Sequence, residues 1–332
     1  MKINREAFLH ALHLIEPGTT TNQSVAQSNC FIFSENHIYA FNDEITCIVK
    51  MEVDFHCAVP AKPLLAVLNK YTDEIVDVSM DDDKLVIKAG RKRTQLNIEA
   101  EVLIPLGITG LPKKWVPMHP EFEEAVGIVR SCAATKSDRF ALTCLHITPS
   151  YIQSCDTRQA CKATMETGAK GETLIRAASI KNIVGMGMTE WGATKAWLFF
   201  KAPTGLIMGI RRWADEYPNI EQVYELTNPQ QFCLPNSIPE ILDRTTIFAN
   251  EQGIEPVIKM IVTENQIEFK GESSNGSHQE RVAINYGGEP FSFNISPKVL
   301  IQAVKNSNEA VLSQDRLSVE FGRFTYVASI GG

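Results

Sequence analysis

The chain has 332 residues, of which 44% are hydrophobic and 21% charged, with a formal net charge of −7 at pH 7. This length suits two or three domains with apolar cores of their own. The acidic balance argues against a nucleic-acid binder that is coated with Lys and Arg over its whole surface. It does not exclude basic residues gathered on one face.

Several features of the sequence predict a cytoplasmic protein. No apolar run approaches the roughly 18 residues that a membrane-spanning helix needs. The opening MKINREAFLHAL has no apolar segment followed by a small-residue cleavage site, so we expect no secretory signal there. The eight cysteines show no CxxC spacing and lie mostly in apolar, strand-like runs, which is typical of reduced core residues in the cytosol.

The first predicted element is an amphipathic helix. Asn4 is a suitable N-cap, Phe8, Leu12 and Ile15 recur on one face, and Pro17 ends the pattern.

Two further helices of this kind follow at nearly constant spacing. One begins near Pro120 and carries Phe122 and Val126, and the other carries Ile238 and Leu242. The spacing from Phe8 to Phe122 and from Phe122 to Ile238 is close to 115 residues, so the pattern indicates an internal repeat.

A second series of segments repeats with the same period. The segments VPAKPLLAVL, IRAASIKNIV and ISPKVLIQAV begin at Val59, Ile175 and Ile295, and each predicts a short strand that leads into a helix. Two alternating strands that meet at a glycine follow each segment, and these glycines are Gly90, Gly205 and Gly322. Three copies of one unit favour a ring or an array over an enzyme with one active site.

The remainder of each unit alternates between apolar and polar residues, as in the closing stretch 324–330. Such alternation is typical of antiparallel strands with one buried and one solvated face. We therefore predict an α+β fold in which each unit is antiparallel sheet with two helices.

Two segments are predicted to be linkers, because Pro and Gly interrupt the periodic patterns of the chain there. They are 104–119 and 225–235. They divide the chain into three predicted domains, 1–110, 111–228 and 229–332.

The chain resembles a known family, the β subunit of bacterial DNA polymerase III, or sliding clamp. No single motif is decisive, but their order and spacing along the whole chain are specific. The chain has trimmed loops, which suggests a divergent bacterial or phage-encoded member. The resemblance rests on MKI…FLHAL, Asn42-Asp43-Glu44, AVPAKPLLAVLNKY, DKLVIKAGRKRTQLNI, Ser137-Asp138-Arg139, CDTRQACK, LIRAASIKNIV, Tyr217-Pro218-Asn219, EILDRTTIFANEQ and FTYVASI.

The resemblance implies a DNA clamp fold of three similar domains, each with antiparallel sheets outside and two helices lining a ring of two protomers. Such a homodimer ring encircles double-stranded DNA without sequence specificity. It acts as a processivity factor in DNA replication, in the bacterial nucleoid or a phage-infected cell. No GxxxxGK[ST] motif occurs, so loading onto DNA would need a separate ATP-dependent clamp loader.

DNA contact is expected from cations on the helices that would line the ring. A sequence-blind protein needs only cations placed along the regular track of phosphates, and weak contacts permit sliding. The alternative is that these residues are ordinary solvated helix faces. The candidates are Arg5, Lys62, Lys70, Arg130, Lys136, Arg139, Lys181, Arg244, Lys298 and Lys305.

The resemblance also implies a hydrophobic pocket that receives a short peptide from the replicative DNA polymerase and other partners. The segment that often reads TDGHRL in the family is Cys155-Asp156-Thr157-Arg158-Gln159-Ala160 here, and the usual methionine-containing tail is Ser329-Ile330-Gly331. Smaller and more polar groups reduce the apolar area, so a different or weaker peptide is expected. The alternative is a sheet edge without a ligand. The matching positions are Leu142, Cys155, Thr157, Arg158, Ala160, Pro218, Val223, Val327, Ser329 and Ile330.

The dimer interface is expected to join Thr94 and Leu96 of one protomer to Ile247 and Phe248 of the other. The alternative is that Ile247 and Phe248 belong to the core. Thr94 stands where the family often has a bulky aromatic residue, so a less tight ring is expected.

The sequence offers no convincing catalytic site, metal site or cofactor motif, so we expect a non-catalytic accessory subunit of a DNA polymerase with no cofactor. Two other function classes stay open. One is a clamp-fold recruiting platform for phage transcription or repair, for which the altered pocket is the motive. The other is a hydrolase that uses Cys155 with His146.

Overall fold

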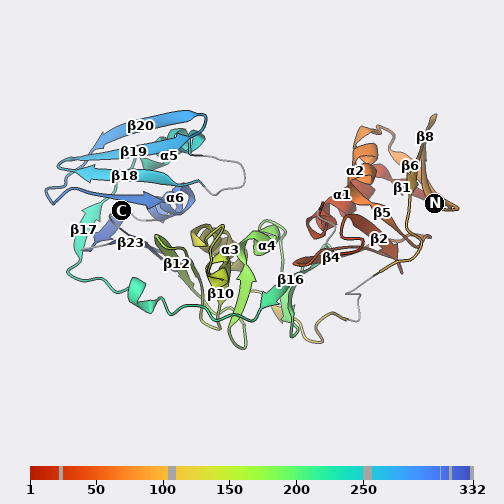
Figure 1. Cartoon of the computed structure of the whole chain (residues 1–332), viewed down its shortest axis with the longest axis horizontal. Coiled ribbons are helices and arrows are strands. Elements are labelled where there is room, and N and C mark those ends of the chain that lie inside the picture. Colours follow the sequence, from red (N-terminus) through yellow and green to blue (C-terminus); the bar gives the residue numbers. More distant parts are fainter. Residues whose placement is uncertain (22–24, 104–109, 250–255, 307, 314–315, 330–332) are drawn as a thin grey trace. The chain divides into compact units, whose positions relative to one another are not determined.

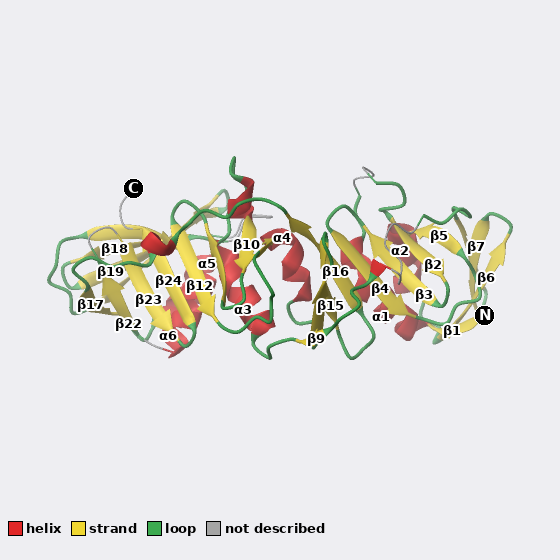
Figure 2. Ribbon diagram, turned by 90° about the horizontal axis from the view of Figure 1, so that it is seen from below, coloured by secondary structure: helices red, strands yellow, loops and turns green. Residues whose placement is uncertain are grey.

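A computed structural model of the chain describes residues 1–21, 25–103, 110–249, 256–306, 308–313 and 316–329. It comprises two compact units (Figures 1 and 2). Unit 1 contains Met1–Pro120 and Gly185–Arg212, and unit 2 contains Glu121–Val184 and Trp213–Gly332. Each unit consists of antiparallel sheets with short helices packed on them. The predicted α+β class is therefore confirmed.

Unit 1 has two main helices, α1 (Arg5–Ile15) and α2 (Ala61–Lys70). The side chain of Asn4 accepts a hydrogen bond from the amide of Ala7 at 3.0 Å, which confirms the predicted N-cap. The predicted apolar face of α1 is fully buried and consists of Phe8, Leu12 and Ile15.

The strands of unit 1 form two sheets. One has the order β1-β6-β7-β8, and the other runs β9-β14-β15-β16-β4-β3-β2-β5. The strands are β1 (Lys2–Asn4), β2 (Cys30–Ser34), β3 (His37–Phe41), β4 (Ile45–Lys50), β5 (Cys57–Pro60), β6 (Ile75–Asp81), β7 (Lys84–Ala89), β8 (Lys92–Asn97), β9 (Val116–Pro117), β14 (Glu190–Ala193), β15 (Trp197–Lys201) and β16 (Ile207–Trp213).

Unit 2 also has two sheets, with the orders β17-β22-β23-β24-β12-β11-β10-β13 and β20-β19-β18-β21. Its helices are α3 (Phe122–Val129), α4 (Ala177–Ile180), α5 (Ile238–Ile247) and α6 (Pro297–Asn306). Its strands are β10 (Cys144–Ile147), β11 (Tyr151–Cys155), β12 (Gln159–Thr164), β13 (Thr173–Arg176), β17 (Gln230–Cys233), β18 (Ile258–Thr263), β19 (Gln266–Ser273), β20 (Gly276–Ala283), β21 (Phe291–Ile295), β22 (Glu309–Leu312), β23 (Arg316–Phe321) and β24 (Phe324–Ser329).

One topology occurs three times along the chain. Each copy consists of two motifs of the form strand, helix, three strands, and the first strand of each motif pairs with the other motif. Thus β1 pairs with β6 and β5 with β2. In the same way β9 pairs with β14 and β13 with β10, and finally β17 pairs with β22 and β21 with β18. The sequence repeat therefore corresponds to a repeat of strand pairing.

The three repeat glycines adopt left-handed backbone conformations. The φ angles are 56° at Gly90, 88° at Gly205 and 56° at Gly322. Glycine adopts positive φ without the steric cost that a Cβ brings, so each glycine permits the tight turn between two strands.

The middle copy differs from the other two. Its second helix, α4, is followed by the 3₁₀ turn η5 (Lys181–Ile183), and Gly185 and Gly187 then take φ angles of 82° and 65°. These left-handed positions end the helical path after about two turns.

Both predicted linkers contain a strand. Val116 of β9 pairs with Trp191, and Gln230 of β17 pairs with Leu312. Neither strand shows an alternating pattern, because each is short and lies at the end of its sheet. Residues 104–109 of the first linker are outside the described part of the chain. The three-domain division at 110 and 228 stays a prediction.

Candidate functional site

A cavity of about 210 Å³ lies in unit 2, between β12, β24 and the segment that follows Tyr217. The sequence places the cavity where β11 turns into β12. Asp156 closes this turn, because its carboxylate accepts hydrogen bonds from the amides of Arg158 at 2.6 Å and Gln159 at 2.8 Å. This Asx turn leaves Thr157 and Arg158 exposed at the cavity.

The inner part of the cavity is apolar. Cys155, Ala160 and Ile220 are buried together, and Val223 and Leu142 pack against them. Ala160 lies opposite Val327 in the antiparallel pair of β12 and β24. The strand register therefore fixes the apolar surface that a bound side chain would meet.

The thiol of Cys155 lies against the side chain of Tyr217. The hydroxyl of Tyr217 donates to its sulfur at 3.4 Å, and burial raises the pKa of the Cys155 thiol above its ordinary value. Burial raises the pKa of Tyr217 as well. A raised thiol pKa opposes thiolate formation, so Cys155 lacks the activation that a cysteine nucleophile needs.

The imidazole ring of His146 contacts Glu172, Gln153 and Tyr217. Its Nε2 lies 3.1 Å from Glu172, its Nδ1 lies 3.2 Å from Gln153, and its ring stacks on Tyr217 with centroids 4.8 Å apart. The hydrolase alternative would need His146 against the thiol of Cys155, whereas the two ring nitrogens of His146 lie against Glu172 and Gln153.

Arg316 forms a wall of the cavity. Its guanidinium donates to the backbone carbonyls of Gln222 and Val223, each at 2.8 Å, and so ties β23 to the 3₁₀ turn η6 (Glu221–Val223). On the other side of this turn, Lys162 lies 2.7 Å from Glu221. The turn that carries Val223 is therefore anchored from two strands.

Most of the predicted pocket positions come together here. Leu142 packs on the same apolar cluster, Pro218 is half-buried nearby in sequence, and Ile330 lies outside the described residues. The pocket residues that line the cavity are Cys155, Thr157, Arg158, Ala160, Val223, Val327 and Ser329.

Sequence reasoning missed four lining residues, namely Asp156, Gln159, Ile220 and Arg316. The first two stand inside the motif that was singled out, and an Asp at the start of a turn is a recognisable signal. Arg316 gave no such signal, because it is about 160 positions away in sequence from Cys155 and only strand pairing brings it near the cavity.

The predicted DNA-contact residues have different surroundings. Lys62, Lys70, Lys136, Arg139 and Lys181 are exposed, whereas Arg130 is half-buried. Arg5 is 16% exposed and donates to the carbonyls of Asp73 and Leu68. The side chain of Lys305 lies outside the described residues.

Arg244 and Lys298 also have protein partners, as Arg5 does. Arg244 is paired with Glu280 at 2.7 Å, and this pairing lowers the pKa of the Glu280 carboxyl. Lys298 donates to the carbonyl of Gly127 at 2.5 Å. Contact with a phosphate would compete with these bonds.

The predicted interface residues lie at end strands of the described sheets. Thr94 and Leu96 are half-buried on β8, and the hydroxyl of Tyr71 lies 2.7 Å from that of Thr94. In unit 2, Ile247 is 67% exposed, and Phe248 stacks on His278 of the end strand β20. Exposure of Ile247 argues against the core alternative for this residue.

No protein-family model matches the chain, and no curated protein matches it. Solved structures match over 100% of the chain. The DNA polymerase III β subunit from Pseudomonas aeruginosa has a TM-score of 0.75 and 14% identity, with 99% of that chain covered. The chain has the sliding-clamp fold.

Two other clamps give the same result. The clamp from Caulobacter crescentus has a TM-score of 0.76 and 18% identity, with 98% of that chain covered. The clamp from Bartonella birtlesii, solved with griselimycin bound, has a TM-score of 0.77 and 15% identity, with 99% covered. The clamp fold that the resemblance implied is thus confirmed, and the low identity is consistent with a divergent chain.

Two negative findings apply to the described residues only. No helix there is long and apolar enough to cross a membrane. No group of three or more His, Cys, Asp or Glu side chains in the described ranges is arranged to hold a metal ion.

Proposed function

We propose that this chain is a DNA sliding clamp, a non-catalytic processivity factor that encircles duplex DNA and tethers a DNA polymerase. The observation that carries the proposal is the swapped two-motif topology, which occurs three times in a chain with the clamp fold over its full length. Three copies per protomer make a closed ring of two protomers possible, and most soluble homo-oligomers have closed symmetry. The domains are proposed to be 1–110, 111–228 and 229–332.

Ring closure is proposed to occur between β8 of one protomer and β20 of another. Both are end strands of their sheets in the described residues, and the backbone of an end strand can pair with a further strand. Ile247, Phe248, Thr94 and Leu96 would supply the apolar contact beside this pairing.

DNA contact in this proposal depends mainly on the exposed cations. Lys62, Lys70, Lys136, Arg139 and Lys181 are exposed and can reach phosphates, and the half-buried Arg130 is a further candidate. Arg5, Arg244 and Lys298 would instead stabilise the fold, because their described bonds are internal. Weak, sequence-independent contact is compatible with sliding, because the closed ring itself retains the DNA.

The partner peptide is proposed to bind in the cavity of about 210 Å³ that Cys155 lines, called the Cys155 cavity. The apolar surface of Ala160, Ile220 and Val327 would hold an apolar side chain, and Thr157, Arg158 and Ser329 would contact the peptide backbone or polar groups. Tethering raises the effective concentration of the polymerase at the primer end. An ATP-dependent clamp loader is a further proposed partner.

A second candidate function is a recruiting platform for transcription or repair proteins. It is favoured by the small volume and polar rim of the Cys155 cavity, which suit a partner peptide different from that of a replicative polymerase. It uses the same fold and the same cavity, so partner binding distinguishes the two.

The ring is tested by light scattering and by retention on DNA. A mass near twice 36.9 kDa is expected, and the protein should remain on a nicked circular duplex through gel filtration and leave after the circle is cut. Ile247→Arg should abolish both results, whereas Val257→Arg, a matched change at another exposed apolar residue, should abolish neither. Monomeric mass together with equal retention on linear and circular DNA would refute the clamp.

The tether is tested with purified polymerases. The replicative DNA polymerase of the host should bind the wild-type chain and lose at least tenfold in affinity with Val327→Arg, which places a charge in the cavity. If the DNA polymerase does not bind but the transcribing RNA polymerase or a repair polymerase does, and with the same sensitivity, the recruiting platform is the correct function.

A further inference from the structure

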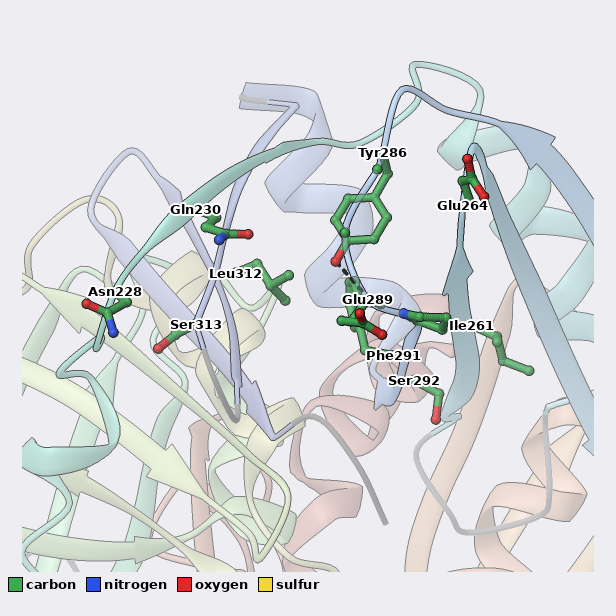
Figure 3. Close-up of a pocket in the computed structure, with 13 residues that line it drawn as sticks. Asn228, Gln230, Ile261, Glu264, Tyr286, Glu289, Phe291, Ser292, Leu312 and Ser313 are labelled. Carbon is green, nitrogen blue, oxygen red and sulfur yellow. Dashed lines mark hydrogen bonds between the residues drawn. The ribbon is translucent and has the colours of Figure 1, made fainter.

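A second and larger cavity, of about 1170 Å³, lies elsewhere in unit 2 (Figure 3). One wall is formed by the end of β17 and β22, with Gln230 and Leu312. The other wall is formed by Ile261 of β18 and by the segment 286–292, which leads into β21. None of these residues belongs to the Cys155 cavity or to the proposed interface.

The segment 286–292 is fixed in place by hydrogen bonds. The carbonyl of Tyr286 accepts from the amide of Asn265 at 2.9 Å, and the hydroxyl of Tyr286 donates to the carbonyl of Glu289 at 2.9 Å. The ring of Tyr286 also meets Phe291 edge to face, with centroids 5.6 Å apart. The cavity therefore has a preformed wall, as binding sites commonly do.

The repeated topology identifies the equivalent region of unit 1, and each of these two regions is called a corner. The amide of Arg5 donates to the carbonyl of Glu74 where β1 leads into α1. The amide of Leu234 donates to the carbonyl of Asn308 at the corresponding place beyond β17. Counting back four residues from Arg5 and from Leu234 matches Met1 with Gln230. Phe55 and Phe291 match in the same way, since each stands four residues before the aligned positions Val59 and Ile295.

The chain itself fills that corner in unit 1. Phe55 is buried there against Phe33, with ring centroids 5.0 Å apart. The amino group of Met1 donates to the carbonyl of Val78 at 2.6 Å and lies 3.4 Å from Asp77 and 3.8 Å from Asp54. An aromatic ring and a cationic amino group flanked by carboxylates thus occupy this position of the fold.

In unit 2 the same corner is open and acidic. Phe291 is only half-buried, and the two charged residues among the described lining residues are the carboxylates Glu264 and Glu289. Ile261, Leu312 and Phe291 supply apolar surface in the walls of the same cavity (Figure 3). This combination matches a lysine or arginine side chain, whose apolar stem and charged end need different surroundings.

The backbone of β21 adds a further element of recognition. It pairs with β18 on one side and is the end strand of its sheet in the described residues, although part of it also lies close to β24. An extended peptide can pair with such an edge through main-chain hydrogen bonds, while alternate side chains enter the adjacent pocket.

We propose that this cavity is a second docking site, which takes an extended peptide segment of a partner protein with a lysine or arginine at its centre. The basic side chain lies between Glu264 and Glu289, its stem contacts Phe291 and Leu312, and the peptide backbone follows β21. The site is independent of the Cys155 cavity, so it would allow two partners to bind one protomer at once.

The test uses the full-length chain and two synthetic libraries of N-acetylated, amidated heptapeptides that are random except at the centre. One library has Lys at the centre and the matched library has Glu. Immobilised wild-type chain should retain the Lys library at least tenfold more than the Glu library. Glu264→Gln combined with Glu289→Gln should lower this retention at least fivefold, whereas Glu320→Gln, an exposed carboxylate on β23, should leave it unchanged.

Three outcomes would overturn the proposal. The first is equal retention of both libraries, or of neither, by wild-type chain whose circular dichroism melting curve shows it to be folded. The second is loss of retention in Val327→Arg, which would assign the peptides to the Cys155 cavity. The third is loss of self-association in the Glu264→Gln/Glu289→Gln variant by light scattering, which would make a second copy of the chain the occupant. The libraries need neither DNA nor a polymerase, so the result is separate from the test of clamp function.

Discussion

The corner around Phe55 in unit 1 and the corner around Phe291 in unit 2 have the same topology, but side chains fill the first and the second borders a cavity. Phe55 is 7% exposed and packs on Phe33, whereas Phe291 lines a cavity of about 1170 Å³. A repeated strand order therefore fixes the position of a corner, while the side chains and the preceding loop decide whether it is filled or open. Four predictions test this contrast.

The largest expected effect is on the stability of unit 1. Phe55→Ala should reduce the free energy of unfolding by about 3–5 kcal/mol, because it removes a buried ring and leaves a void. Phe291→Ala should cost about 1 kcal/mol or less, because its ring is half-exposed and borders an existing cavity. Urea denaturation followed by circular dichroism measures both. Equal losses would mean that the two corners are packed alike.

The second prediction concerns how the free energy of unfolding depends on alkaline pH, through Cys57 beside the unit 1 corner. Burial raises the pKa of the Cys57 thiol to about 12 from its ordinary value near 9, while Phe293, the matching position in unit 2, does not titrate. Above pH 9 the unfolded chain releases this proton and the native state keeps it, so stability falls as pH rises toward 12. The Cys57 contribution to this slope should be about 1.4 kcal/mol per pH unit.

The measurement is urea unfolding at pH 8, 9, 10 and 11 in the presence of a reductant. Cys57→Ala should show a shallower decline above pH 9, whatever its stability at pH 8. An unchanged slope would show that the native thiol ionises as easily as the unfolded one.

A third and smaller effect concerns the loop that keeps the unit 2 corner open. A Cβ at Gly288 would meet the hydroxyl of Tyr286, whereas a Cβ at Gly287 would meet nothing within 4 Å. Gly288→Ala should therefore displace the tyrosine, break its hydrogen bond to Glu289 and cost about 1 kcal/mol. Gly287→Ala is the matched control and should be close to neutral. Thermal melts of the two variants distinguish them, and identical melts would contradict this role of Tyr286.

The smallest expected effect is on the charged groups that close the unit 1 corner. Asp77 is half-exposed and lies 3.4 Å from the amino group of Met1, so solvent screens the pair. Asp77→Asn should cost about 0.5 kcal/mol or less at low salt, and the loss should vanish in 0.5 M NaCl, since exposed ion pairs contribute little. A loss that persists in high salt would indicate a hydrogen-bonding role rather than a charge effect.

The sequence predicted much of the fold because the relevant signals are local. The Asn4 cap, the apolar face of α1 and the turn glycines Gly90, Gly205 and Gly322 each depend on neighbouring residues, and all of them are confirmed. The strands β9 and β17 were missed, because a short strand is defined by its partner across the sheet rather than by its own pattern.

The candidate site was predicted in part for the same reason. The motif from Cys155 to Ala160 is continuous, so the resemblance to the clamp family could assign it to a pocket. Arg316 and Ile220 could not, because strand pairing and the packing of η6 bring them to the cavity. The internal bonds of Arg5, Arg244 and Lys298 were equally invisible, since a cation looks the same in sequence whether it faces a carbonyl, a carboxylate or solvent.

By itself, then, the sequence determined a threefold repeat of strand, helix and turn, an α+β fold and the apolar faces of its helices. These follow from periodicity and backbone preference, which act over a few residues. Only the tertiary structure decided which strands exchange between motifs, which cations are engaged and which of two equivalent corners is open. Those outcomes depend on contacts between residues far apart in the chain, whose geometry no local pattern encodes.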